Sequence, residues 1–397
     1  LGITIHTPPY YGRIDIAQKK GEKKMHIQEF KVERWMNTYE LGARYNLAET
    51  DAKPFTLQEL LSLGEQEKLT SRLMELKLGY NPTTGSETLR QAIASQYAQT
   101  NPDQVLVTTG AIEADFILTN VLVEPGDTVI VQFPAYQVLY SVATARGAKV
   151  KHWTMSFAEG YKPNLAQLAE LIDDRTKLIV LNNPHNPTGA VIPQKDLQTI
   201  LQWAEEKDFW VLCDEVYHGL AFQEGLLPPP ARDLSQRAIS VGSMSKTFGL
   251  SGLRLGWLAG PQELLHACWM WKDYTSISNS PLSDFLATLA LEKIDKVRER
   301  NLALAKQNLK MLLKWFNQHS QQVDYVKPQA GLVCFPHFKL PISTAEFCRR
   351  AYTEKGVLLV PGECFDSPGY IRFGFGGDPK DFAAGLQELS DLCKEIS

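Results

Sequence analysis

The feature that most constrains this fold is a regular alternation of two kinds of segment from about residue 83 onward. Short runs rich in Val and Ile, which suit buried strands, alternate with longer segments of helical periodicity. The expected strands are 105–109, 128–131, 148–153, 177–181, 210–214 and 238–242. The expected helices are 86–99, 111–122, 134–145, 165–172 and 194–206. This pattern predicts an α/β domain with a mostly parallel sheet covered by helices on both faces.

A different pattern begins near residue 282. Segment 282–316 predicts one long helix that bends near 292–295 and bridges two domains. The remainder is α+β in character, with strands expected at 331–335, 357–360 and 370–375 and helices at 344–355 and from 379 onward. An early helix at 32–38 is expected to pack with this part. The expected units are an N-terminal extension or arm at 1–24, a segment packing with the small domain at 25–75, a large domain at 76–290 and a small C-terminal domain at 291–397.

Composition narrows the class of protein. A chain of 397 residues suits two domains. A net charge of −4 does not indicate binding to nucleic acid or to an anionic membrane. The eight histidines show no metal-ligand spacing, so no metal site is expected. None of the six cysteines forms a C-x-x-C pair, which favours isolated thiols in a reducing compartment. No apolar run reaches membrane-span length and no signal peptide is evident, so the cytoplasm is the expected location.

Three strings near expected strand ends carry residues suited to chemistry. Lys246 lies in Ser-Met-Ser-Lys-Thr-Phe-Gly-Leu-Ser-Gly-Leu-Arg, and its amine can form a Schiff base with a carbonyl. Asp214 ends an apolar run and opens Asp-Glu-Val-Tyr, while Asn186 lies in the rigid turn Asn-Pro-His-Asn-Pro-Thr-Gly. Taken alone, Lys246 suits a solvated loop and Asp214 a helix cap. Because ligands of α/β sheets collect at the carboxyl ends of the strands, we expect these residues to meet.

These strings, in this order between about Tyr80 and Arg372, resemble the signature of fold-type I pyridoxal phosphate (PLP) enzymes, the class I/II aminotransferases of the aspartate aminotransferase superfamily. The resemblance implies a large domain with a seven-stranded, mostly parallel sheet, a smaller α+β domain, and a homodimer with shared active sites. It also implies that Lys246 holds PLP as a Schiff base and acts as the general base.

Four residues would surround the PLP ring if this resemblance holds. Asp214 would keep the pyridine nitrogen protonated, which makes the ring an electron sink. Asn186 and Tyr217 would bond its 3′-oxygen, and Tyr136 would stack on its face. The catalytic residues implied by the resemblance are therefore Lys246, Asp214 and Tyr217.

The remaining groups that the site must bind are the cofactor phosphate and the substrate carboxylate. The residues matched to the phosphate are Gly110, Ala111 and Ile112 at a helix start, with Ser243, Ser245 and Arg254 around the lysine. Ile112 departs from the polar residue common there and can offer only its backbone amide. Tyr80 resembles the tyrosine that reaches the neighbouring subunit's phosphate. Arg372 resembles the small-domain arginine that binds the substrate α-carboxylate, with Asn186 beside it.

The implied substrates are an L-amino acid and a 2-oxo acid, but other PLP reactions stay open. His185 makes Asn-Pro-His-Asn-Pro resemble the cystathionine β-lyase branch as well, whereas Tyr217 stands where that branch favours His and so favours transamination. Segment 47–55 lacks the family's usual G-x-P-x-F and resembles a capreomycidine-synthase-like subgroup. A β-lyase or β-replacement enzyme is thus the alternative. Arg372 argues against a decarboxylase, which would gain nothing from binding the carboxylate.

Two classes outside PLP catalysis fit less well. A PLP-binding regulator without turnover would carry an added DNA-binding segment, and residues 1–79 are short and not notably basic. A nucleotide-binding Rossmann protein would show G-x-G-x-x-G after the first strand. The substrate side chain is not deducible, since no second arginine is placed as a distal-carboxylate ligand; Arg13, Arg34 and Arg44 lie in the region that contributes to the pocket in relatives.

Overall fold

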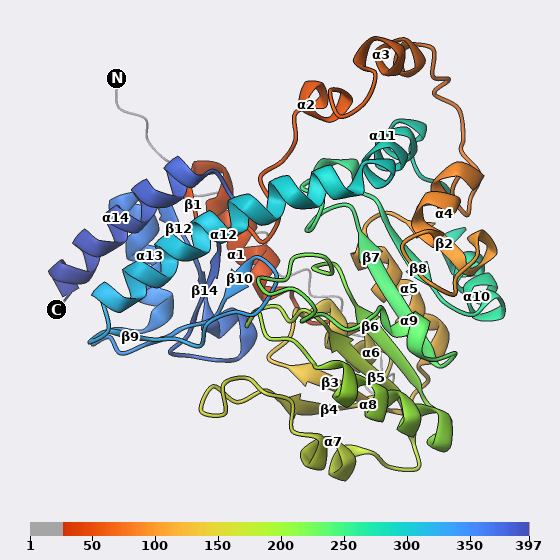
Figure 1. Ribbon diagram of the computed structural model, residues 1–397. Helices are drawn as coiled ribbons and strands as arrows, with labels where there is room; N and C mark the ends of the chain where they lie inside the picture. The colour runs from red at the N-terminus through yellow and green to blue at the C-terminus, as the bar shows by residue number, and fades with distance from the viewer. Residues whose placement is uncertain (1–26, 397) are drawn as a thin grey trace, which may run out of the picture.

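The structure is a computed structural model that describes residues 27–396, and Figure 1 shows its two packed parts joined by a long helix. The larger part is built on a seven-stranded sheet with the order β2-β8-β7-β6-β5-β3-β4. The strands are β2 Val105–Thr108, β3 Thr128–Phe133, β4 Lys149–Thr154, β5 Thr176–Asn182, β6 Trp210–Asp214, β7 Ala238–Ser243 and β8 Gly256–Ala259. β8 is antiparallel to both of its neighbours, and the other pairs are parallel. The predicted α/β class with a mostly parallel sheet is confirmed.

Helices cover both faces of this sheet because alternate strand residues point to opposite sides. Val129 and Val131 of β3 belong to the core beneath α5, α6 and α10, whereas Ile130 belongs to the core beneath α7 and α8. The helices of this part are α4 Glu87–Ala94, α5 Ala111–Leu122, α6 Val138–Ala145, α7 Leu165–Leu171, α8 Gln194–Lys207, α9 Ala231–Leu234 and α10 Gln262–Lys272. Both faces of the sheet are therefore covered by apolar side chains, and polar side chains lie at the strand ends.

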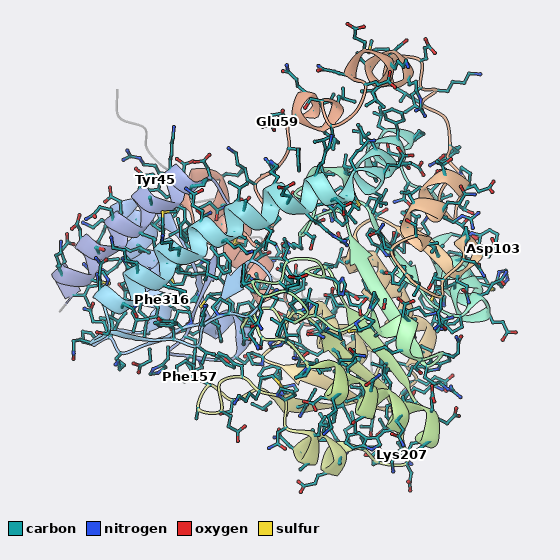
Figure 2. All side chains as sticks on the ribbon, in the orientation of Figure 1. Tyr45, Glu59, Asp103, Phe157, Lys207 and Phe316 are labelled. Carbon is teal, nitrogen blue, oxygen red and sulfur yellow. The ribbon has the colours of Figure 1, made fainter. Side chains whose placement is uncertain are left out.

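The long helical stretch is broken as predicted. α11 Pro281–Glu292 ends one residue before α12 Ile294–Gln318, and Lys293 between them has non-helical backbone angles. α12 leads into the smaller part and carries Phe316, which is labelled in Figure 2. Phe316 packs edge to face on Phe373 of β14, with ring centroids 5.6 Å apart. The remaining helices are α1 Lys31–Tyr39, α2 Leu57–Leu61, α3 Gln66–Met74, α13 Thr344–Lys355 and α14 Pro379–Ile396.

Three small sheets complete the smaller part. β10 Val333–Cys334 and β13 Val360–Pro361 flank β14 Ile371–Gly374, β9 Val323–Asp324 pairs with β11 His337–Phe338, and β1 Tyr45–Asn46 pairs with β12 Val357–Leu358. Four 3₁₀ helices are η1 Glu40–Gly42, η2 Pro102–Gln104, η3 Ser251–Leu253 and η4 Gly362–Phe365. The β1–β12 pair joins a segment near the N-terminus to the C-terminal part. The domain boundaries given above stay a prediction, and the extension at 1–24, with Arg13, lies outside the described residues.

Two predicted helices were wrong in extent. The helix expected from Pro134 begins only at Val138, because residues 134–137 form a separate turn in which the Gln137 side chain bonds the backbone of Glu29 and Lys31. The helix expected over 86–99 ends at Ala94, and the amides of residues 98 and 99 bond the carboxylate of Asp233 instead. No helix within residues 27–396 is long and apolar enough to cross a membrane.

Candidate active site

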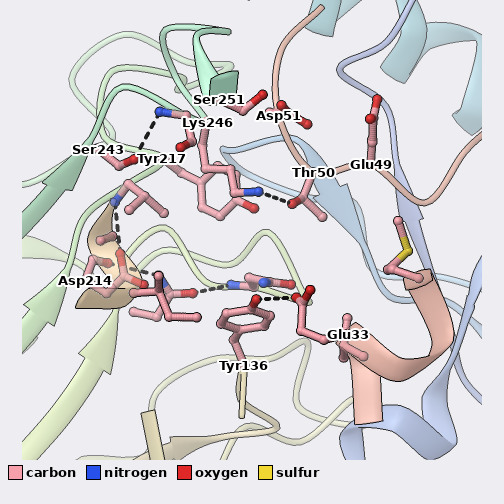
Figure 3. A pocket seen from close by; sticks show the side chains of 18 of the residues that line it. Glu33, Glu49, Thr50, Asp51, Tyr136, Asp214, Tyr217, Ser243, Lys246 and Ser251 are labelled. Atoms are coloured by element: carbon pink, nitrogen blue, oxygen red, sulfur yellow. Dashed lines mark hydrogen bonds between the residues drawn. The ribbon is translucent and has the colours of Figure 1, made fainter. Parts of the chain in front are cut away.

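A pocket of 480 Å³ opens where β5, β6 and β7 end and the smaller part faces the sheet (Figure 3). It is lined by Val32, Glu33, Met36, Glu40, Ala48, Glu49, Thr50, Asp51, Ala111, Ile112, Asp115, Tyr136, Asn182, Asn186, Asp214, Val216, Tyr217, Ser243, Ser245, Lys246, Ser251, Arg254 and Arg372. Most of the residues expected at the site thus meet in one place, as predicted from the carboxyl ends of the strands.

Lys246 is placed by the loop that follows β7. Its Nζ donates to Thr50 Oγ1 at 2.7 Å, and its carbonyl accepts from the amide of Ala52 at 3.1 Å. Burial lowers the pKa of Lys246, and nearby Asp51 partly opposes that shift. A lowered pKa increases the fraction of neutral amine, which is the form that attacks a carbonyl or accepts a proton.

Asp214 ends β6 at the bottom of the pocket. Its Oδ1 accepts from the Val216 amide at 3.1 Å, and burial raises its pKa to about 6. Asn182, at the end of β5, donates to the Asp214 carbonyl at 2.9 Å and accepts from the Asn186 amide at 2.6 Å. The carboxylate and Asn186 are therefore held by one bonded unit built on two adjacent strands.

Asp115, which the sequence analysis missed, is a second acid on this side of the pocket. It lies on α5, is 3% exposed, and its Oδ1 has no hydrogen-bond partner in the described chain. Burial, followed by the charge of Asp214, raises its pKa well above the ordinary value. Burial thus favours the neutral form of Asp115, which lies near the ionisable Asp214.

Arg372 enters the pocket from β14. Its Nη1 donates to Asn186 Oδ1 at 3.3 Å and its Nη2 to the Ala48 carbonyl at 3.2 Å. The residue is 3% exposed, and its Nε lacks a partner within residues 27–396. A buried guanidinium with a free donor is a ready site for a ligand carboxylate. Tyr217, whose pKa burial raises, lies beside it.

An anion cradle is formed where α5 begins. Gly110 precedes α5 with φ 77°, and a Cβ built there would lie 2.8 Å from the Arg254 guanidinium. A Cβ on Gly256 would meet the Ala111 amide nitrogen at 2.5 Å, so both glycines permit this close approach. Ser243 Oγ accepts from the Ser245 amide at 3.0 Å. A helix start, two serines and an arginine together suit a phosphate.

Two predicted aromatic residues have different positions. Tyr136 lines the pocket, and its hydroxyl donates to Glu33 Oε1 at 2.5 Å. Tyr80 is 90% exposed and does not line the pocket of its own chain.

Neither Arg34, which pairs with Glu29, nor Arg44, which lies over the Tyr45 ring, lines the pocket.

Fold and site together define a fold-type I PLP-dependent enzyme, with an amine for the aldehyde, an acid at the sheet edge and a cradle for the phosphate. The family described as aminotransferase class I and II matches residues 47–389. The chain belongs to this family, whose members are PLP-dependent.

Similar proteins include enzymes of more than one reaction. Capreomycidine synthase of Streptomyces vinaceus is 32% identical over 361 residues, which cover 91% of this chain and 92% of the relative. The crystal structure of a PLP-dependent aminotransferase from Streptococcus suis is 34% identical with a TM-score of 0.89, covering 94% of this chain and 99% of that one. The structure of the PLP-dependent cyclase OrfR is 28% identical with a TM-score of 0.86, covering 96% and 100%.

Proposed function

We propose that this protein is an aminotransferase that moves an amino group between an L-amino acid and a 2-oxo acid. The observation that carries the proposal is the convergence of Lys246, Asp214 and Arg372 on one pocket from three separate strands or strand ends. When bound, PLP supplies an electron sink for the charge that develops at the substrate Cα. The pocket fits PLP because the Gly110–Arg254 cradle suits an anionic phosphate, and the unpartnered Nε of Arg372 leaves a donor for the substrate carboxylate.

Lys246 has two roles under this proposal. Its amine would hold the cofactor aldehyde, and once displaced it would take the proton from the substrate Cα. Thr50 fixes the position of the amine through the 2.7 Å hydrogen bond. The lowered pKa of Lys246 increases the fraction of neutral amine that can act as a base.

The other residues bind and orient. Arg372 would hold the substrate α-carboxylate, and Asn186 would align both the cofactor and Arg372. Asp214 would keep the ring nitrogen protonated, Tyr217 would bond the 3′-oxygen and Tyr136 would stack on the ring. The phosphate would lie between Gly110, Ala111 and Ile112 of α5 and the side chains of Ser243, Ser245 and Arg254.

Tyr80 would act across a dimer. Its hydroxyl is exposed and lies outside its own pocket, which suits contact with a second subunit's phosphate. The loop that carries it is fixed: Asn81 donates to Asp284 at 2.7 Å, and the buried Lys272 donates to the Thr83 carbonyl and to Asn279. A rigid, outward-facing loop supports a homodimer with shared active sites.

A β-elimination or β-replacement reaction is the second candidate. The similarity to capreomycidine synthase and to a PLP-dependent cyclase favours it. Both reactions begin with removal of the Cα proton by Lys246. They differ in whether a group then leaves the substrate Cβ. The structure of the substrate therefore determines which reaction follows.

A spectral screen of L-amino acids against the purified holoenzyme tests the proposal. Conversion of the cofactor to its pyridoxamine form, with release of one equivalent of 2-oxo acid, is expected. Lys246→Ala should abolish the lysine–cofactor absorbance and turnover. Release of ammonia and an oxo acid without an amino acceptor would favour the second candidate, and full turnover by Lys246→Ala would contradict both.

A further inference from the structure

One side of the pocket carries four carboxylates, which we call the acidic rim: Glu33, Glu40, Glu49 and Asp51. Glu33 lies on α1, Glu40 begins η1, and Glu49 and Asp51 follow β1. In Figure 3, Glu33, Glu49 and Asp51 lie on the side of the pocket opposite Asp214 and Ser243. These three carboxylates therefore lie across the pocket from Asp214, away from the sheet edge.

Within the described chain the acidic rim forms no ion pair, although Lys246 attracts Glu40, Glu49 and Asp51 electrostatically. The cations that line the pocket within the described chain are Lys246, Arg254 and Arg372, and the proposed function assigns each of them to the cofactor or to the α-carboxylate. Glu33 accepts from the Tyr136 hydroxyl. The side chains of Glu40, Glu49 and Asp51 make no hydrogen bond or ion pair with any residue in 27–396. Within residues 27–396, these three carboxylates thus have no direct cationic partner.

The rim carboxylates are close enough to affect one another's ionisation. Burial is the main cause of the raised pKa of Glu49, and Asp51 and Glu40 add to it. Burial also raises the pKa of Glu40, with further contributions from Glu33 and Asp51. A positive charge placed among them would remove this mutual repulsion.

The backbone that presents Glu49 and Asp51 is held firmly. A Cβ on Gly374 would lie 1.6 Å from the Glu49 carbonyl oxygen, and a Cβ on Gly376 would lie 2.0 Å from that of Asp51. Asn46 Oδ1 accepts from the amides of residues 48 and 49, and the Ala52 amide bonds Lys246. The backbone of both residues is therefore fixed relative to Lys246 and to the strand that carries Arg372, which favours a binding role over a solvated loop.

Arg372 gives the direction in which a ligand would lie. Its Nε is unpartnered, although the residue is 3% exposed and lines the same pocket. Among residues 27–396 no group of three acidic, histidine or cysteine side chains is spaced to hold a metal ion. A carboxylate bound at Arg372 would leave the remainder of an amino acid directed at carboxylates that suit an organic cation, whose charge is spread over several donors.

We infer that the substrate is a basic α-amino acid whose side chain ends in a guanidinium or ammonium group that binds the acidic rim. The inference rests on the proposed function for the position of the α-carboxylate and the α-amine. It also explains why no cation remains in the described lining for a second carboxylate: an acidic side chain would meet the carboxyl groups of the acidic rim.

Binding without amino transfer provides the first test. The holoenzyme is titrated calorimetrically with 4-guanidinobutanoate, pentanoate and glutarate, none of which carries an α-amine. The guanidino acid should bind at least about tenfold more tightly than pentanoate, and glutarate more weakly than either. Glu49→Gln and Asp51→Asn should each reduce that preference and leave pentanoate affinity unchanged, while Glu170→Gln on the exposed face of α7 should change neither. Equal affinities for the first two ligands, or tighter glutarate binding, would overturn the inference.

Rates of cofactor conversion provide the second test. L-Arginine or L-lysine should convert the cofactor to its pyridoxamine form at least about tenfold faster than L-norleucine or L-glutamate. Faster conversion by L-norleucine or L-glutamate would overturn the inference and leave the proposed function standing. If no amino acid converts the cofactor while the guanidino acid keeps its binding preference, amino transfer is wrong and the cationic specificity stands.

Discussion

The amine nitrogen of Lys246 lies 2.7 Å from the hydroxyl oxygen of Thr50, although 196 positions separate the two residues in the sequence. The Lys246 carbonyl also accepts from the amide of Ala52. The loop after β1 therefore determines both the position of the Lys246 backbone and the direction of its side chain. The same loop carries Glu49 and Asp51, so the proposed proton-transfer group and these two members of the acidic rim share one support.

Thr50→Val should slow the reaction without preventing folding. The substitution keeps the branched shape of a residue that is 7% exposed and removes the acceptor that holds the Lys246 amine. Loss of one such hydrogen bond should lower kcat about tenfold, with a smaller change in KM. The isotope effect from Cα-deuterated substrate should increase, because proton transfer becomes more fully rate-limiting. Thr50→Ser retains the hydroxyl and is the control. An unchanged kcat and isotope effect for Thr50→Val would show that the bond does not position the base.

The two acids beneath the pocket should respond differently to the same substitution. Asp214→Asn removes the charge that is proposed to face the ring nitrogen, and kcat should fall at least about hundredfold. Burial and the charge of Asp214 raise the pKa of Asp115 and favour its neutral form, so Asp115→Asn should keep kcat within about threefold of the wild type. Steady-state kinetics and cofactor absorbance on both variants provide the measurement. A loss for Asp115→Asn as large as that for Asp214→Asn would mean that Asp115 is ionised.

Local patterns predicted much of this molecule. Helix α13 has its predicted bounds because Ser343 caps its start and Gly356 ends it in the left-handed conformation. Strand β8 was missed, since its four residues follow the lysine string directly and its antiparallel place between β7 and β2 depends on contacts distant in sequence.

The candidate site shows the same contrast between residues that a local pattern indicates and residues that only contacts distant in sequence bring into place. Lys246, Asp214 and Asn186 were found because each lies in a distinctive string near a strand end. Thr50 was missed because nothing in its neighbourhood indicates that it reaches Lys246. Asp115 was missed because an acid in a helix is usually solvated, and only the packing of α5 on the sheet buries it.

Replacing Glu49 should stabilise the protein at high pH. Burial, reinforced by Asp51 and Glu40 and opposed by Lys246, raises the pKa of Glu49 to about 7. Because the folded-state pKa lies above the unfolded one, the stability contributed by protonated Glu49 is complete below the ordinary carboxyl range and is lost as pH rises through about 7. Glu49→Gln should therefore match the wild type near about pH 4.5 and exceed its free energy of unfolding by about 1–3 kcal/mol above about pH 8.

Urea unfolding across that pH range measures the effect of Glu49→Gln. Glu170→Gln removes an exposed carboxylate on α7 and should run parallel to the wild type at every pH. A constant difference between Glu49→Gln and the wild type would mean that Glu49 titrates as an ordinary surface acid. A gain at high pH together with weaker binding of 4-guanidinobutanoate would indicate that the carboxylate is retained for ligand binding at a cost in stability.

Mixing two inactive variants should restore activity if Tyr80 serves a neighbouring subunit. Lys246→Ala removes the amine of one pocket, and Tyr80→Ala removes the exposed phenol that is proposed to reach the other. In a mixed dimer, the chain with native Lys246 receives native Tyr80 from its partner, so one of the two sites is complete. Random reassortment of equal amounts should yield about a quarter of wild-type activity, because half of the dimers are mixed and each has one complete site. Activity no higher than the mean of the two separate variants, with mixed dimers verified by native mass spectrometry, would place the function of Tyr80 within its own chain.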